Sequence, residues 1–146
     1  MSNVSPTDLV FVPLGGTEEI GMNFNLYGLR SSNHEDWIIV DLGITFGDDT
    51  MPGVEIVVPD ASFAQEKREY LHGIILTHGH EDHLGAVPYL WDQLRCPVYA
   101  TPFTAALLRK KIHENIGNSE CEIIEVPLKG KFDIGPFSIE LLSLTH

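Results

Sequence analysis

The 146-residue sequence predicts an α/β domain, with a mixed β-sheet and flanking helices. The pattern along the chain carries this prediction: short apolar strands come first, strands and helices then alternate, and further strands follow. The composition agrees, since 43% hydrophobic and 21% charged residues are typical of folded globular domains. No apolar stretch reaches the roughly 18 residues of a membrane helix, so no membrane association is expected.

The first predicted elements are strands. Leu9–Leu14 is apolar and ends at a Gly-Gly turn, and Met22–Leu29 alternates apolar with polar residues. Trp37–Leu42 is almost entirely apolar, which predicts burial on both faces of the sheet. Residues 43–59 contain several glycines and prolines and predict a long loop, a feature that often carries function in compact domains.

Helices and strands alternate in the next segment. Asp60 can cap a helix that runs to about Tyr70, and Thr101 can cap a longer one that Gly117 ends. The predicted elements, in chain order, are a helix from 60 to 70, a strand at Gly73–Thr77, a helix at Leu84–Leu94 with Pro88 in its first turn, a strand at Pro97–Ala100, a helix at Pro102–Asn115, and strands at Ile123–Val126, Lys131–Ile134 and Phe137–Leu144.

Composition excludes several functional classes. The formal net charge of −12 argues against a protein that coats duplex nucleic acid. Cys96 and Cys121 lack the spacing of a disulfide framework or a thiolate zinc site. The N-terminal residues show neither the basic region nor the apolar run of a secretory signal, so we expect a cytoplasmic protein.

One cluster predicts metal chemistry. His78, His80, Asp82 and His83 fall within six positions, between an apolar strand and a predicted helix. Imidazole and carboxylate groups are ligands that suit zinc and similar divalent ions. Two histidines one residue apart can bind one ion, while the following two residues point elsewhere and favour a second ion. An isolated histidine would more often be an ordinary surface or core residue, but four such residues in this context indicate a metal site.

This cluster resembles the His-x-His-x-Asp-His signature of the metallo-β-lactamase superfamily. Further segments resemble its ribonuclease J branch, in the β-CASP group, and extend the similarity over essentially the whole chain. They are PLGGTEEIGMN (13–23), VDLG (40–43), PGVEIVVPD (52–60), GIILTHGHEDHLGAVPYL (73–90) and PVYATPFT (97–104). The resemblance implies the first half of the superfamily's αββα sandwich. Residues 1–146 would then be the N-terminal portion of a metallo-β-lactamase domain, with the β-CASP and C-terminal domains absent from this chain.

The resemblance also implies roles for individual residues. His78 and His80 would hold one ion, Asp82 and His83 a second, and His146 would be the fifth ligand. His80 and Asp82 would be catalytic. Asp41 would orient the metal-binding loop through a hydrogen bond, as carboxylates behind histidine ligands do.

The implied function is a metal-dependent ribonuclease with 5′–3′ exonuclease and endonuclease activity in RNA processing and decay. It would use two divalent ions, with zinc favoured and manganese as the alternative, for phosphodiester hydrolysis. The substrate would be single-stranded, 5′-monophosphorylated RNA, and the full-length protein would be a homo-oligomer. The chain of 146 residues is expected to be inactive alone. The sequence predicts no substrate-binding residues.

Two other functions stay open from the residues alone. The same metal loop serves hydrolases of thioesters, lactones or small phosphodiesters, and a non-catalytic metal-binding fragment or scaffold is also compatible. Gly15, Gly16, Gly21 and Asn23 are interpreted either as the rim of the site or as turn residues. Arg109, Lys110 and Lys111 are interpreted as the solvated face of a helix.

A last expectation concerns the sheet. Strands such as Trp37–Leu42 are apolar on both faces, so one face would be bare in this chain and promote self-association.

Overall fold

The computed structural model describes residues 7–116 and 120–144. Within them, six strands form one mixed sheet in the order β1-β2-β3-β6-β7-β8. Strands β1 to β3 pair antiparallel, whereas β3, β6, β7 and β8 pair in parallel. The predicted α/β class with a mixed sheet is therefore confirmed. The strands are β1 (Asp8–Gly15), β2 (Phe24–Arg30), β3 (Glu35–Leu42), β6 (Leu71–Ile75), β7 (Val98–Ala100) and β8 (Ile123–Glu125).

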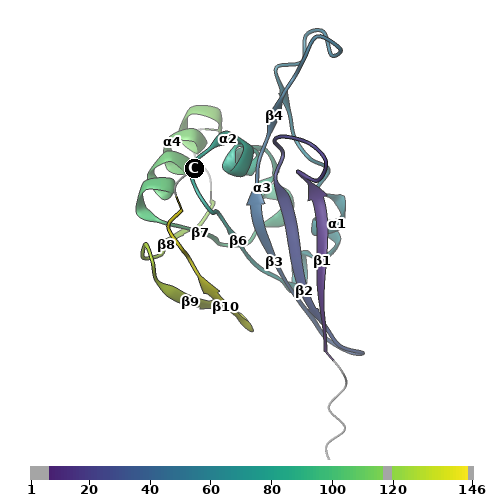
Figure 1. The fold of residues 1–146 in the computed structure, drawn as a ribbon, viewed down its shortest axis with the longest axis vertical. Helices are drawn as coiled ribbons and strands as arrows, with labels where there is room; N and C mark the ends of the chain where they lie inside the picture. The colour runs from purple at the N-terminus through teal and green to yellow at the C-terminus, as the bar shows by residue number, and fades with distance from the viewer. Residues whose placement is uncertain (1–6, 117–119, 145–146) are drawn as a thin grey trace, which may run out of the picture.

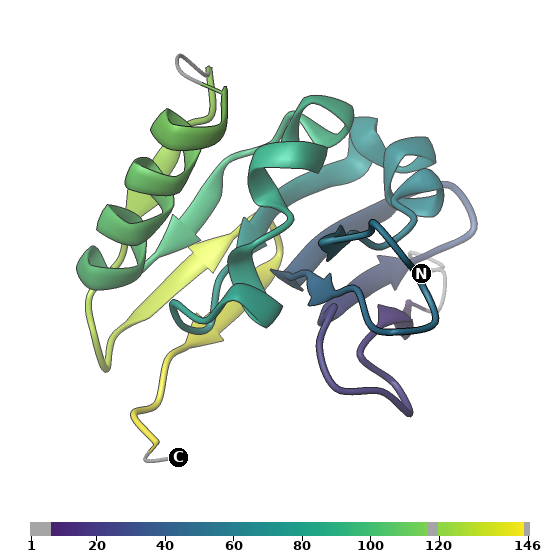
Figure 2. The same ribbon diagram turned by 90° about the horizontal axis from the view of Figure 1, so that it is seen from above.

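Helices cover one face of this sheet (Figure 2). They are α1 (Ser62–Glu66), the 3₁₀ helix η1 (Arg68–Tyr70), α2 (Glu81–Leu84), α3 (Val87–Leu94) and α4 (Pro102–Ile116). Side chains alternate across each strand, so Trp37 and Ile39 of β3 point to the helices and join the main core. Leu90, Leu94 and Leu108 come from α3 and α4 and complete that core from the helical side.

A hairpin packs on part of the opposite face. It consists of β9 (Lys131–Ile134) and β10 (Phe137–Glu140), and Ile134 contacts a second apolar cluster that includes Ile38 and Ile75 of the sheet. Phe132 of the hairpin stacks on Tyr99 of β7, with ring centroids 5.8 Å apart. The hairpin thus extends the apolar packing of the sheet beyond its helical face.

The described residues leave the same face uncovered over β1 and β2. Leu9, Phe11 and Tyr27 lie there with 69%, 53% and 36% of their surfaces exposed. Phe11 and Tyr27 are cross-strand partners with ring centroids 5.1 Å apart. We call these three residues the apolar strip.

Two regions differ from the sequence prediction. Residues 43–59 are a hairpin rather than a plain loop, because β4 (Thr45–Phe46) pairs with β5 (Ile56–Val57) and the segment between them projects from the body (Figure 1). The helix predicted at 84–94 is two helices, α2 and α3. The break follows from Pro88, which has no N–H to donate to Leu84, and from the Ala86 N–H, which donates to Leu42 of β3 at 3.0 Å.

Other boundaries shift by a few residues. The helix predicted at 60–70 is α1 followed by η1, and the Asp60 carboxylate accepts a hydrogen bond from the N–H of Ser62, the first residue of α1. Strand β6 begins at Leu71, and β10 ends at Glu140 rather than at 144. No helix among the described residues is long and apolar enough to span a membrane.

Candidate metal centre between β6 and α2

The four ligand-type residues gather where β6 leads into α2. His78 Nε2 lies 3.1 Å from His80 Nδ1, and Asp82 Oδ2 lies 3.4 Å from His83 Nε2. The rings of His78 and His83 are 4.0 Å apart between centroids. We call these two sets, His78 with His80 and Asp82 with His83, the two donor pairs. His146 lies outside the described residues.

The separations within the pairs suit ligands that share an ion. Two nitrogen ligands at zinc distances in a tetrahedral shell stand about 3.3–3.4 Å apart, close to the 3.1 Å of the His78–His80 pair. Among the described residues, however, no group of three or more His, Cys, Asp or Glu side chains is arranged to hold an ion. The donor chemistry and the paired geometry therefore fit divalent ions, but each pair needs further ligands to complete a coordination shell.

Asp41 supports this loop from the end of β3. Its carboxylate is buried, with 5% of the residue exposed. Oδ1 accepts the N–H of Thr77 at 2.8 Å, and Oδ2 lies 2.7 Å from His83 Nδ1. This contact orients the imidazole so that Nε2 faces Asp82. Parallel pairing of β3 with β6 brings residue 41 beside the loop, where the resemblance predicted a supporting carboxylate.

The pKa of His83 follows from these neighbours. Burial lowers the pKa of the imidazole, but the hydrogen bond and charge of Asp41, together with the charge of Asp82, raise it by more. The net result is a pKa above the ordinary value for histidine.

The loop is also held through its backbone. The N–H of Asn23 donates to the carbonyl oxygen of Asp82, and the N–H of Ile44 donates to that of Glu81, each at 3.0 Å. The amide nitrogen Nδ2 of Asn23 reaches the same Asp82 carbonyl at 3.0 Å and lies 3.4 Å from Asp82 Oδ2. Asn23 therefore contacts the loop directly, a role that its place in the PLGGTEEIGMN segment left open.

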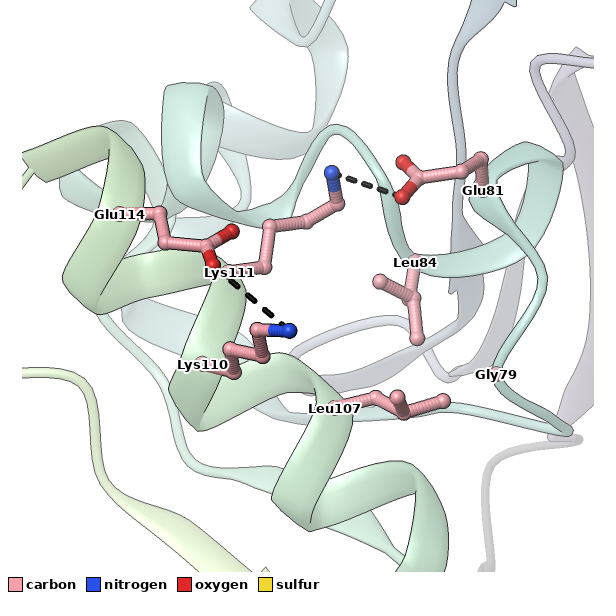
Figure 3. Close-up of a pocket in the computed structure, with 7 residues that line it drawn as sticks. All are labelled: Gly79, Glu81, Leu84, Leu107, Lys110, Lys111 and Glu114. Carbon is pink, nitrogen blue, oxygen red and sulfur yellow. Dashed lines mark ion pairs between the residues drawn. The ribbon is translucent and has the colours of Figure 1, made fainter.

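Helix α4 meets the loop from the other side. Lys111 Nζ lies 2.8 Å from Glu81 Oε1, and only 20% of the Lys111 side chain is exposed. Figure 3 shows Lys111 extending from α4 toward Glu81. Both residues line a pocket of about 190 Å³. The interpretation as a solvated face was therefore wrong for Lys111, whereas the Lys110 side chain is 74% exposed as expected. The pocket lining is Gly79, Glu81, Leu84, Leu107, Lys110, Lys111 and Glu114.

Comparison with known proteins agrees with this architecture. Residues 25–140 match the Metallo-beta-lactamase superfamily. Ribonuclease J of Sinorhizobium meliloti is 47% identical over 139 residues, which cover 95% of this chain and 25% of the relative. Ribonuclease J 1 of Streptococcus pyogenes is 34% identical over 148 residues, which cover 100% of this chain and 26% of the relative. The chain thus spans about a quarter of the length of these curated relatives.

A solved structure supports the fold. Zinc-bound PqqB from Methylobacterium extorquens superposes with a TM-score of 0.52 at 14% sequence identity, over 82% of this chain and 42% of that one. At this identity the likeness concerns the fold alone. The predicted metallo-β-lactamase fold and the resemblance to ribonuclease J are both confirmed by these comparisons.

Proposed function

The chain belongs to the metallo-β-lactamase superfamily, and from this premise we propose that it supplies metal ligands to a ribonuclease. The identity of 47% to a ribonuclease J supports the choice of RNA as substrate. We propose further that residues 1–146 form the N-terminal portion of a metallo-β-lactamase domain, and that β-CASP and C-terminal domains lie outside this chain. The coverage of only 25% of that relative supports this division.

The two donor pairs are the observation that carries the proposal. His78 and His80 would hold one divalent ion, Asp82 and His83 a second, and His146 would add a fifth ligand. Zinc is the favoured metal and manganese the alternative, because imidazole and carboxylate together suit both ions. The ions would supply Lewis acidity toward the phosphate and a lower pKa for bound water.

The residues of the chain have distinct tasks in this proposal. His80 and Asp82, one from each donor pair, would be the catalytic residues because each would hold one of the two ions that contact the substrate. Asp41 would hold His83 in its orientation through the 2.7 Å contact with Nδ1. The substrate would be single-stranded, 5′-monophosphorylated RNA, cut both from its 5′ end and internally. We propose a cytoplasmic protein that is a homo-oligomer at full length.

The test measures hydrolysis by the full-length protein. Its substrates are 5′-monophosphorylated single-stranded RNA, a thioester and a lactone, each with and without chelator. His80→Ala and Asp82→Ala should each lower RNA hydrolysis by several orders of magnitude, since each removes a ligand from one of two cooperating ions. Asp41→Ala should lower the rate of RNA hydrolysis about 10–100-fold, the usual effect of removing a group that orients a histidine ligand. His34→Ala is the control, because His34 precedes β3 at the opposite end from the loop and should leave the rate unchanged.

The possible results separate the functions. Chelator-sensitive release of nucleotides, lost in His80→Ala, supports the ribonuclease. Turnover of the thioester or lactone with RNA intact would instead show a small-molecule hydrolase. A metal-loaded protein without activity on any of the three substrates would point to a scaffold.

A further inference from the structure

Thr77 connects the buried carboxylate of Asp41 to His78, a member of the His78–His80 donor pair. Thr77 Oγ1 lies 2.8 Å from Asp41 Oδ2 and 3.0 Å from Asp41 Oδ1. The same oxygen lies 3.0 Å from His78 Nδ1. Asp41 also contacts His83, so one carboxylate is linked to a histidine of each donor pair.

Counting protons fixes the direction of each hydrogen bond. The Asp41 carboxylate faces three donor groups, the N–H and hydroxyl of Thr77 and the Nδ1 of His83, and its oxygens are the acceptors in these hydrogen bonds. A hydroxyl has a single proton, and the Thr77 hydroxyl uses it toward Asp41. Thr77 Oγ1 can therefore only accept from His78, so His78 Nδ1 must carry a proton.

The consequence concerns the other ring nitrogen. With a proton on Nδ1, a neutral His78 has its lone pair on Nε2, the atom that faces His80. His83 is arranged in the same way, because its Nδ1 donates to Asp41 and its Nε2 faces Asp82, so the lone pair of its neutral form lies on Nε2. In His78 and in His83, the ring nitrogen that faces the other ligand of the pair is therefore the one whose lone pair can bind a metal.

We propose that Thr77 is a positioning residue that transmits the orienting effect of Asp41 to His78. A single buried carboxylate then sets the tautomer of one histidine in each donor pair, His78 and His83. The inference rests on the proposed function in that it assumes metal binding by these pairs. It goes beyond that function by assigning Thr77, which follows β6, a role in orienting His78. Removal of the hydroxyl should impair the His78–His80 pair and spare the Asp82–His83 pair.

The experiment compares Thr77→Val, which keeps the shape but removes the hydroxyl, with Thr77→Ser, which keeps the hydroxyl. The first measurement is ¹⁵N NMR of the histidine rings in the metal-free, full-length protein. We expect Nδ1-protonated His78 and His83 in the wild type and in Thr77→Ser. In Thr77→Val, only His78 should lose this preference, while His83 serves as the internal reference.

The second measurement is the affinity for Zn²⁺ and Mn²⁺, obtained by titration against a chelator. Thr77→Val should lower the affinity for one of the two bound ions by about 10–100-fold, the range for groups that orient a histidine ligand. Asp41→Asn should lower the affinity for both ions, and Thr77→Ser should keep wild-type affinity. Thr45→Val in β4 controls for loss of a hydroxyl elsewhere and should change neither ion.

Several results would overturn the inference. They are Nε2-protonated His78 in the wild type, a Thr77→Val protein with unchanged tautomer and affinity, and a Thr77→Ser protein that behaves like Thr77→Val. The wild-type NMR result decides the matter even if Thr77→Val does not fold. Failure of the proposed function is separate, since it would show as a wild type that binds no metal or does not cleave RNA.

Discussion

Gly43 follows β3 and packs against the loop of the candidate metal centre, and the absence of a side chain at Gly43 permits this close contact. A Cβ at this position would stand 1.7 Å from the carbonyl oxygen of Asp82 and 2.6 Å from the backbone nitrogen of His83. Because backbone atoms cannot rotate away as a flexible side chain can, Gly43→Ala should destabilise the fold by about 1–3 kcal/mol, as overpacking does. Chemical denaturation of wild type and variant measures this difference.

A second glycine provides the control for Gly43→Ala. Gly53 has a positive φ of 81°, and an added Cβ there would meet no atom within 4 Å. Gly53→Ala therefore reports backbone strain alone, about 1–2 kcal/mol for a residue in the left-handed region. Metal affinity separates the two variants, since only Gly43→Ala displaces Asp82 and His83. Unchanged metal affinity and stability in Gly43→Ala would contradict the close packing of the loop on β3.

Some residues of the candidate site carry a signal in the sequence and others do not. His78, His80, Asp82 and His83 are adjacent in the chain, so their spacing alone shows a cluster, and Asp41 followed from the resemblance. Thr77 offered no such signal, and Asn23 was left open between the rim of the site and a turn, because their contacts join residues 36 and 59 positions apart. Hydrogen bonds over such separations depend on strand pairing, which a local pattern does not specify.

At the scale of elements, strands were easier to predict than their ends and connections. The apolar runs identified β3 and β6 because burial on both faces leaves a strong signal. The pairing of β4 with β5 was missed, since each strand has only two residues, Thr45–Phe46 and Ile56–Val57, within a segment rich in turn-forming residues. The division between α2 and α3 was missed because it depends on a backbone hydrogen bond from Ala86 to β3.

The contact of α4 with α2 gives a prediction at this scale. The ion pair of Lys111 with Glu81 is a polar link between these helices, and the two side chains are 20% and 43% exposed. Lys111→Met should lower the free energy of unfolding by about 0.5–1 kcal/mol, the upper part of the range for accessible ion pairs. Thermal or urea denaturation at low salt provides the measurement.

The neighbouring lysine is a matched control. Lys110 Nζ lies 3.8 Å from Glu114 Oε1, and these side chains are 74% and 59% exposed. Lys110→Met should thus have no measurable effect on stability. A double-mutant cycle with Glu81→Gln isolates the coupling of Lys111 with Glu81, and a coupling of zero would show that the link does not stabilise the contact between the helices.

For the molecule as a whole, the charge distribution bears on the proposed substrate. Three of its nine basic residues, Arg109, Lys110 and Lys111, are consecutive in α4. Each is within ion-pair distance of a glutamate, namely Glu125, Glu114 and Glu81 respectively. The cluster therefore adds little net positive potential to a chain with a formal charge of −12. Attraction of RNA by this chain would depend on the proposed divalent ions, which are large local positive charges.

The apolar strip predicts how the isolated 146-residue chain behaves in solution. Leu9, Phe11 and Tyr27 continue the apolar face that the β9–β10 hairpin covers elsewhere, and contiguous exposed apolar surface promotes association. We expect sedimentation velocity to show an average mass that rises above 16.2 kDa with concentration. Replacing all three residues by Thr, which suits strands, should weaken association by about tenfold or more, or ~1.4 kcal/mol. Phe103→Thr, at a 73% exposed site on α4, should leave association unchanged. A wild-type chain that is monomeric at every concentration would contradict the prediction.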